Sequence, residues 1–181
     1  MDEINKFRIL NKLKSVYRFN SVDNRKESSA EHSWSALMLA DMYMTKELDR
    51  LKVYELLMYH DVVEIEAGDT PFHPEMSRDG KKEKEEKAIK ILKKQLPRKL
   101  SGKFIKLVKE FEDRKTIEAR YAKAIDTLDA AIHELDYRKD WKGWTKEFLV
   151  KNKSKYFDDF PELKKAFDTI IQHLVDEKYF H

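Results

Sequence analysis

The stretch TIEARYAKAIDTLDAAIHEL, residues 116–135, decides the fold of this chain. Its apolar residues recur every three or four positions, which is the period of one helix face. Thr116 is a suitable N-cap, because its hydroxyl can accept a backbone N–H of the first helical turn. The pattern predicts a long helix whose apolar stripe is interrupted by Asp126. A carboxylate in such a stripe needs a partner.

The same helical period continues through most of the remaining chain. Ser28 and Glu31 have the spacing of a capping box, which predicts that a helix begins there. Gly68, Pro71 and Pro74 predict a loop over residues 67–79. No segment has a convincing β pattern, so we expect a single all-α domain over residues 1–181. Further helices are expected over residues 4–17, 51–62, 88–96 and 104–111, and after Pro161.

Composition narrows the classes of protein that this chain can represent. The 37 Lys and Arg residues are interspersed with 34 acidic ones, so no nucleic-acid-binding surface is expected. The charges of residues 81–94 alternate in sign, which predicts a solvated helix face. The chain has no cysteine, which excludes disulfides and thiolate metal sites and fits a reducing cytoplasm. We expect a cytoplasmic protein, because there is no signal-peptide pattern and no apolar run of ~20 residues that could span a membrane.

Titratable residues stand in apolar surroundings at three separate places. His60 and Asp61 lie near the end of the expected helix over residues 51–62, with Glu64 just after it. His32 precedes an apolar run, and Asp126 interrupts the long helix. Each can be read singly as a capping or ion-paired residue, but one shared cation explains His32, His60, Asp61 and Asp126 more economically. Two imidazoles and two carboxylates suit one divalent ion such as Mn, Co, Fe or Zn. Glu64 would then transfer protons beside the water that this ion activates.

The order His … His-Asp … Asp resembles the signature of the HD-domain phosphohydrolases, an all-helical superfamily. The sequence is most similar to its 5′-deoxynucleotidase family, and the similarity runs from about Leu13 to Asp129. It is carried by three blocks of residues: Leu13-Lys14, Arg18, Arg25, Glu27-Ser28 and Ala30-Glu31-His32-Ser33; His60-Asp61-Val62-Val63-Glu64, Ala67-Gly68-Asp69 and Pro71; and Phe111-Glu112, Thr116, Glu118-Ala119, Lys123-Ala124-Ile125-Asp126 and Leu128.

This resemblance implies a metal-dependent enzyme that cleaves deoxynucleoside 5′-monophosphates to deoxynucleoside and phosphate. It implies that His32, His60, Asp61 and Asp126 are the metal ligands and that Glu64 is the catalytic acid/base. It further implies that Arg18 binds the phosphate, and that Asp69 lies near the sugar and helps select deoxyribose. Phe19 stands where relatives have Trp, which keeps an aromatic wall but removes area and an N–H donor, so we expect less strict rejection of ribose. The resemblance also implies a homodimer.

Several alternatives remain open from the sequence. Two-metal or di-iron chemistry needs additional ligands, but His73 is the one histidine between His60 and Asp126, which favours a single metal. We expect His133, His173 and His181 to be surface or core residues. A nucleotide-binding regulatory module, a helical interaction scaffold or a hydrolase of another phosphate ester are the competing functions. The aromatic residues toward the C-terminus could form part of a dimer interface or a second layer of the core. They are Trp141, Trp144, Phe148, Tyr156, Phe157 and Phe160.

Overall fold

Helix α7 (Ile117–His133) forms the centre of the computed structural model, which describes residues 1–180. The Thr116 hydroxyl accepts the backbone N–H of Ala119 at 3.3 Å, so the predicted cap is confirmed. Most positions of α7 are buried, and several of these are alanines. Because alanine is small, helices α2 (Ser29–Tyr43) and α3 (Arg50–Tyr59) pack closely against α7.

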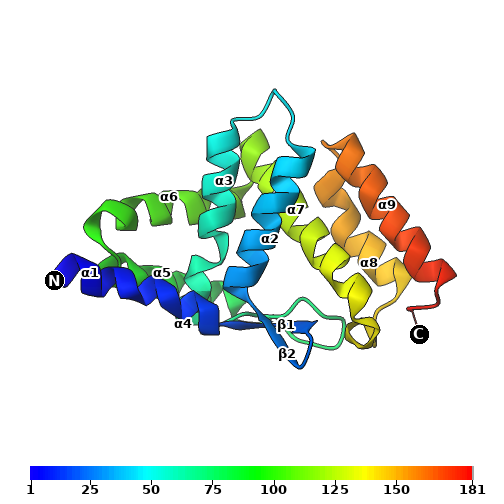
Figure 1. Ribbon diagram of the computed structural model, residues 1–181, viewed down its shortest axis with the longest axis horizontal. Helices are drawn as coiled ribbons and strands as arrows, with labels where there is room; N and C mark the ends of the chain where they lie inside the picture. The colour runs from blue at the N-terminus through cyan, green and yellow to red at the C-terminus, as the bar shows by residue number, and fades with distance from the viewer. Residues whose placement is uncertain (181) are drawn as a thin grey trace.

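The other helices flank this central group on two sides (Figure 1). Helices α5 (Lys81–Gln95) and α6 (Arg98–Asp113) lie on the side of the N-terminal helix α1 (Asp2–Phe7). Helices α8 (Lys146–Lys153) and α9 (Pro161–Asp176) lie on the opposite side. Shorter segments connect them: α4 (Glu64–Ala67) and the 3-10 helices η1 (Arg8–Ser15), η2 (His60–Val63), η3 (Glu134–Asp136), η4 (Arg138–Trp141) and η5 (Ser154–Phe157). The expectation of an all-α fold is confirmed.

The predicted capping box opens helix α2. Ser28 Oγ accepts the backbone N–H of Glu31, and the Glu31 carboxylate accepts the backbone N–H of Ser28 at 2.9 Å. The two reciprocal bonds satisfy donors that a helix start would otherwise leave unpaired. This cap fixes where α2 begins, and therefore places His32 in its first turns with a buried imidazole.

The expectation that the chain contains no strand is wrong at one place. Strands β1 (Tyr17–Val22) and β2 (Arg25–Ser28) form an antiparallel hairpin, where residue 17 was expected to belong to a helix. Val22 pairs with Arg25, so the loop is Asp23-Asn24, and Asp23 adopts a left-handed φ of 47°. Asp and Asn tolerate that conformation. The sequence did not reveal the hairpin, because β1 alternates aromatic and polar residues over only four positions and β2 contains no apolar residue.

Polar contacts hold β1 against the segment that follows α7. Asp140 accepts both the backbone N–H and the hydroxyl of Ser21, at 2.6 and 2.9 Å. Asn20 Nδ2 donates to Glu134 at 2.9 Å, and His133 Nε2 lies 2.7 Å from the Ser21 carbonyl oxygen. These bonds fix a strand that has little apolar surface of its own.

Trp141, Trp144 and Phe157 are buried in the core of this chain, whereas Phe148, Tyr156 and Phe160 are partly buried. The structure therefore favours a core layer over an interface for the first three. Helix α8, which was not expected, carries Leu149 into this layer. Helix α8 was difficult to predict because its apolar period is weak: charged residues occupy half of its eight positions.

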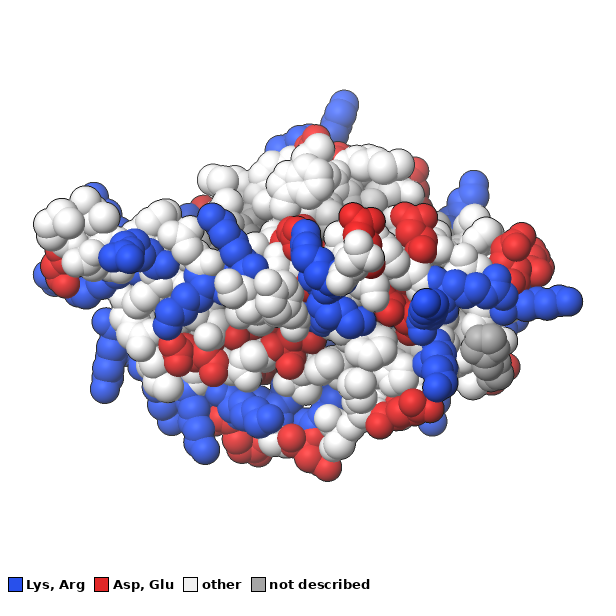
Figure 2. All heavy atoms as spheres, turned by 60° about the horizontal axis from the view of Figure 1, so that its bottom comes forward, with Lys and Arg blue, Asp and Glu red and all other residues white. Residues whose placement is uncertain are grey.

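Charged residues cover the outside as the sequence predicts. Helix α5 buries Ala88 and Leu92 and leaves its alternating charges largely in solvent. Figure 2 shows one face of the molecule, on which Lys and Arg are interspersed with Asp and Glu. Across residues 1–180, no helix combines the length and the apolar character that a bilayer crossing requires.

We expect Asp140→Ala to lower the free energy of unfolding by about 1–3 kcal/mol, because it leaves the Ser21 N–H and hydroxyl without their acceptor. Urea denaturation monitored by circular dichroism measures this change. Asp136→Ala is the matched control, since Asp136 is exposed and its loss should cost less than about 0.5 kcal/mol. Equal effects of the two substitutions would contradict the anchoring role of Asp140.

Candidate active site

Two buried histidines from different helices face each other. His32 Nδ1 lies 2.8 Å from Asp129 Oδ2, and its Nε2 lies 2.9 Å from Asp126 Oδ1. His60 Nδ1 donates to the Leu57 carbonyl oxygen at 2.6 Å. In each ring Nδ1 is held by an acceptor, Asp129 for His32 and the Leu57 carbonyl for His60, which fixes the orientation of Nε2 toward the other ligand candidates. This is the arrangement that metal-binding histidines usually have.

The four residues that the sequence predicts as ligands come together. Ligand atoms of His32, His60 and Asp61 all lie within 4.8 Å of one another. Asp126 Oδ1 lies 3.9 Å from His60 Nε2, and Asp61 Oδ1 lies 3.2 Å from the same nitrogen. His60 Nε2 is nevertheless buried without a hydrogen-bond partner among the described residues. A divalent cation would satisfy this nitrogen, so these residues fit a metal ion and could hold one.

The charge balance of the group also favours a cation. Burial and Arg18 lower the pKa of His32, but the hydrogen bonds to Asp126 and Asp129 outweigh them and raise it to about 10. Without a bound cation, the carboxylates therefore hold a proton on this imidazole. A metal ion would supply the same positive charge among the same carboxylates.

Lys123 and Asp129 belong to this site but had no role in the sequence-based prediction. Lys123 Nζ contacts Asp126 Oδ2 at 2.6 Å, and Asp129 accepts from both His32 and Ser35. Each is three residues from Asp126 on α7, which places all three on one helix face. That spacing is a signal from which both residues could have been found.

Glu64 lies next to the metal-ligand candidates, at the start of α4. Ser29 Oγ donates to Glu64 Oε2 at 2.6 Å. Burial raises the pKa of Glu64 well above its ordinary value, and the charge of Asp61 adds to the effect, while Arg18 opposes it. A carboxyl group whose pKa is raised can hold a proton that an ordinary carboxylate would lose, as acid/base work requires.

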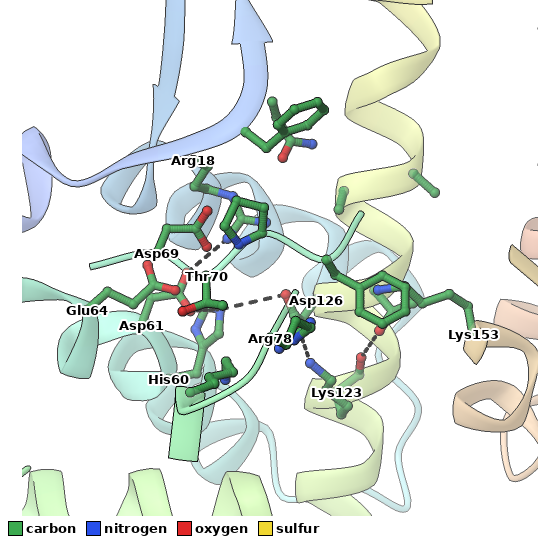
Figure 3. A pocket seen from close by; sticks show the side chains of 18 of the residues that line it. Arg18, His60, Asp61, Glu64, Asp69, Thr70, Arg78, Lys123, Asp126 and Lys153 are labelled. Carbon is green, nitrogen blue, oxygen red and sulfur yellow. Dashed lines mark hydrogen bonds and ion pairs between the residues drawn. The ribbon is translucent and has the colours of Figure 1, made fainter. Parts of the chain in front are cut away.

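Asp69 follows Gly68, whose φ of 72° and ψ of 157° end α4 in a conformation that favours glycine. This turn brings Asp69 beside Glu64 in the pocket (Figure 3). Burial raises the pKa of the Asp69 carboxyl, whereas Arg18 lowers it. The structure thus places Asp69 with Glu64, at one side of the metal-ligand candidates.

Arg18 reaches the site from strand β1. Its Nη1 donates to Asp61 Oδ2 at 3.2 Å, and its Nε lies 3.3 Å from Glu27 Oε2. Burial lowers the pKa of Arg18, but Asp61 and Glu64 more than compensate, so the guanidinium is firmly charged. A guanidinium has five N–H donors, which leaves several for a phosphate group.

Phe19 packs against the loop that follows α4. Its ring centroid lies 4.9 Å from that of His73. His73 Nε2 contacts the Lys142 carbonyl oxygen at 2.9 Å, and its Nδ1 accepts the Glu75 backbone N–H. Both ring nitrogens of His73 are therefore engaged away from the metal-ligand candidates, consistent with a single metal.

The later histidines lie apart from this group. His133 contacts the Ser21 carbonyl, and His173 is exposed on α9, while His181 lies outside the described residues.

One pocket, whose cavity volume is about 140 Å³, is lined by most of the site residues: Arg18, Phe19, His60, Asp61, Glu64, Asp69, Lys123 and Asp126. This volume is roughly ten times the volume that one water molecule requires, so a substrate group fits. In Figure 3, Glu64, Asp61 and Asp69 lie on one side of Asp126, whereas Arg78, Lys123 and Lys153 lie beside it or on the other side. Arg78 and Lys153 could not be recognised as site residues from the sequence, because a charge-rich chain offers no pattern that distinguishes one lysine or arginine from the next.

Comparison with known protein families identifies the fold and the superfamily. The family model described as HD domain matches residues 10–164. The crystal structure of a predicted metal-dependent phosphohydrolase from Magnetospirillum magnetotacticum is similar, with a TM-score of 0.88 and 28% identity over 99% of this chain and 94% of that one. An HD-domain phosphohydrolase from Listeria innocua shares the fold, with a TM-score of 0.59 and 20% identity over 94% of this chain and 84% of that one.

Two curated relatives carry a more specific name. The 5′-deoxynucleotidase HDDC2 of Bos taurus is 26% identical over 133 residues, which cover 72% of this chain and 65% of the relative. The protein of that name from Dictyostelium discoideum is 27% identical over 144 residues, 74% of this chain and 76% of the relative. The chain matches slightly less than two thirds of the length of the bovine protein.

We expect His60→Ala to abolish binding of a divalent metal, because it removes the buried nitrogen that has no other partner. Metal content after purification, measured by plasma mass spectrometry, tests this directly. Metal should also stabilise the wild-type protein, by about 2.7 kcal/mol at one hundred times its dissociation constant. His173→Ala is the control and should keep both properties. Full metal occupancy in the His60 variant would contradict the assignment.

Proposed function

The chain belongs to the HD-domain family, and within this family we propose that it is a metal-dependent 5′-deoxynucleotidase. It would hydrolyse deoxynucleoside 5′-monophosphates to deoxynucleoside and phosphate. The observation that carries this proposal is the position of Glu64 and Arg18, which lie beside the buried His-His-Asp group in one pocket. An acid/base and a phosphate-binding cation are the two groups that phosphomonoester hydrolysis needs in addition to a metal.

We assign the metal to four residues: His32, His60, Asp61 and Asp126. This mixed set of nitrogen and oxygen ligands suits one ion of Mn, Co, Fe or Zn. When bound, such an ion supplies Lewis acidity, which lowers the pKa of water and polarises a phosphoryl oxygen. Asp129 and the Leu57 carbonyl would orient the two imidazoles, and Lys123 would fix the carboxylate of Asp126.

Arg18 and Glu64 would carry out the steps that belong to the chain itself. Arg18 would hold the phosphate dianion with the N–H groups that do not face Asp61 and Glu27. Glu64 would accept a proton from the attacking water and deliver one to the leaving 5′-oxygen. In this reaction a water oxygen bonds to phosphorus, the bond between phosphorus and the 5′-oxygen breaks, and no redox change occurs.

The sugar would lie between Asp69 and Phe19. Asp69 lines the pocket next to Glu64, and the Phe19 ring forms an apolar wall with His73 behind it. A 2′-hydroxyl placed against such a wall would lose water without gaining a partner, which disfavours ribose. The aromatic wall is smaller than an indole would make it, so the discrimination is incomplete.

We further propose that the protein acts as a cytoplasmic homodimer made of a single domain per chain. Trp141, Trp144 and Phe157 are buried in the chain itself, so a dimer would need other apolar surface. Trp34, Met38 and Met42 are exposed at intervals of four residues on α2. Light scattering coupled to size-exclusion chromatography measures the assembly state.

A regulatory role without catalysis is the competing proposal. It would require nucleotide binding without turnover. Against it, Glu64, Arg18 and three of the four ligand candidates, His60, Asp61 and Asp126, line one pocket, which supports turnover over binding alone. We therefore favour the enzyme.

Glu64→Gln should keep the metal while kcat falls by about 10²–10⁴-fold, the range typical of a lost general acid/base. Glutamine keeps the shape of the side chain but does not exchange a proton near neutral pH. Phosphate release and metal content should be measured on the same preparation. Glu66→Gln, two residues further along α4, is the control and should stay near wild-type activity. A Glu64 variant within a few-fold of wild type would show that this residue is structural.

A panel of nucleoside monophosphates tests the substrate assignment. We expect dAMP to be hydrolysed faster than AMP, with measurable activity on AMP because Phe19 forms a smaller wall than Trp. Phe19→Trp should increase the ratio of kcat/KM for dAMP over AMP. Equal turnover of the two nucleotides would refute the deoxyribose preference alone. Metal-loaded protein that releases phosphate from no monophosphate would refute the nucleotidase proposal.

A further inference from the structure

The ammonium group of Lys153 faces the pocket from the end of α8. Lys153 Nζ lies 4.1 Å from the ring centroid of Phe72, and both residues line the pocket. Among residues 1–180, no carboxylate lies within 4.0 Å of this nitrogen. Charged groups that lose water are normally paired with an opposite charge. Lys153 is therefore a partly buried amine without an anionic partner among these residues, and an anion bound beside it would hold it in its charged form.

The neighbours of Lys153 do not supply the missing charge. Burial lowers the pKa of Lys153 to about 7, and Lys123 and Arg78 lower it as well, while Asp126 and Glu134 oppose them. Burial also raises the pKa of Glu134 to about 8, with a further contribution from Asp140. Glu134 is thus mainly uncharged at neutral pH, and its Oε1 already accepts from Asn20.

A second cation lies over the same aromatic ring. The guanidinium carbon of Arg78 is 5.2 Å from the Phe72 centroid. Trp144, which also lines the pocket, has a buried indole N–H without an acceptor among the described residues. Figure 3 shows Arg78 and Lys153 in the pocket, away from the carboxylates of Glu64 and Asp69. This part of the pocket offers donors and positive charge, and Arg18 does not contribute to it.

From this geometry we propose that Lys153 and Arg78 form a second anion subsite that binds a phosphate group of the substrate other than the one being hydrolysed. This inference rests on the proposed function and extends it from monophosphates to nucleotides with two phosphate groups. A phosphate fits better than a neutral base carbonyl, because its charge would hold the proton on Lys153 and would also pair with the exposed guanidinium of Arg78. Phe72 then forms an apolar floor under the two cations.

Two classes of nucleotide carry a second phosphate group that could bind at this subsite, and the products of their hydrolysis differ. In a deoxynucleoside 3′,5′-bisphosphate, water would cleave the 5′-phosphate ester and the 3′-phosphate would stay on the sugar. In a deoxynucleoside 5′-diphosphate, cleavage of the bond between the 5′-oxygen and phosphorus would release pyrophosphate. In both, water supplies the oxygen on phosphorus and the proton on the 5′-oxygen.

The test compares Lys153→Met with Lys151→Met, an exposed lysine of the same helix. Initial rates should be measured for dAMP, dADP and 2′-deoxyadenosine 3′,5′-bisphosphate in the presence of Mn²⁺, with phosphate and pyrophosphate assayed separately. Dissociation constants for the same three nucleotides should be measured by calorimetry in the Glu64→Gln background, where turnover is slow. Calorimetry separates binding at the subsite from chemistry at the metal-ligand residues.

We expect one of the doubly phosphorylated nucleotides to have a kcat/KM about tenfold above that of dAMP in the wild type. Lys153→Met should remove this advantage through KM and weaken binding of that nucleotide about tenfold, the effect of one lost charge-assisted hydrogen bond. In Lys153→Met, the kcat/KM and the dissociation constant for dAMP should change less than threefold. Lys151→Met should change neither the values for dAMP nor those for the doubly phosphorylated nucleotides. The product identifies which of the two classes is bound.

Three results would overturn the proposal, and each differs from failure of the nucleotidase itself. The first is a wild type without a preference for a second phosphate. The second is a Lys153→Met variant in which dAMP and the doubly phosphorylated nucleotides are affected equally. The third is the same effect of Lys153→Met and Lys151→Met. Failure of the proposed function is recognised separately, because metal-loaded wild type would then hydrolyse none of the three nucleotides.

Discussion

The carboxylate of Asp126 is the group on which the arrangement of the site depends. It interrupts the apolar stripe of α7, where an unpaired charge would be costly. Its two oxygens contact Lys123 and His32, and one of them lies 3.9 Å from His60. Burial alone would raise the pKa of Asp126, but Lys123, His32 and His60 lower it well below its ordinary value. A charge held so firmly on the central helix draws side chains from α2 and from the end of α3 to one point.

The turn that carries His60 and Asp61 also contributes to the position of the site. Helix α3 ends at Tyr59, and the tighter 3-10 helix η2 carries both residues. Both are buried, and His60 Nδ1 bonds back to the Leu57 carbonyl in the last turn of α3. That bond satisfies a carbonyl that the end of an α-helix leaves free. The change of helix type thus positions a ligand candidate and caps the helix at once.

Much of this arrangement could be predicted from the sequence, and the exceptions share one physical cause. The caps Thr116 and Ser28 and the apolar period locate α7 and α2, and polar residues within apolar stripes identify His32, His60 and Asp126. These signals are local. Arg18 directly follows a segment expected to be helical, residues 4–17, but it lies on a hairpin held by the pairs Asn20–Glu134 and Ser21–Asp140, whose partners are more than one hundred residues apart. Contacts between residues so far apart produce no periodic pattern in the sequence. The contact of Lys153 with Phe72 is of the same kind.

A row of polar side chains along α7 connects the metal-ligand candidates to the cationic end of the pocket. Lys123, Asp126, Thr127 and Glu134 belong to one helix or its immediate continuation, and all of them line the cavity. Their charges are not equivalent, since Asp126 is ionised and Glu134 is mainly neutral at neutral pH because burial raises its pKa to about 8. Negative charge is therefore concentrated where a metal would be held, and Lys153 feels the charge of Asp126 only from a distance, without an ion pair among the described residues. A substrate aligned with α7 would meet the metal-ligand candidates at one end and Lys153 and Arg78 at the other. A second anionic group there would hold the proton on Lys153, which favours substrates with anionic groups at both ends over those with a single phosphate.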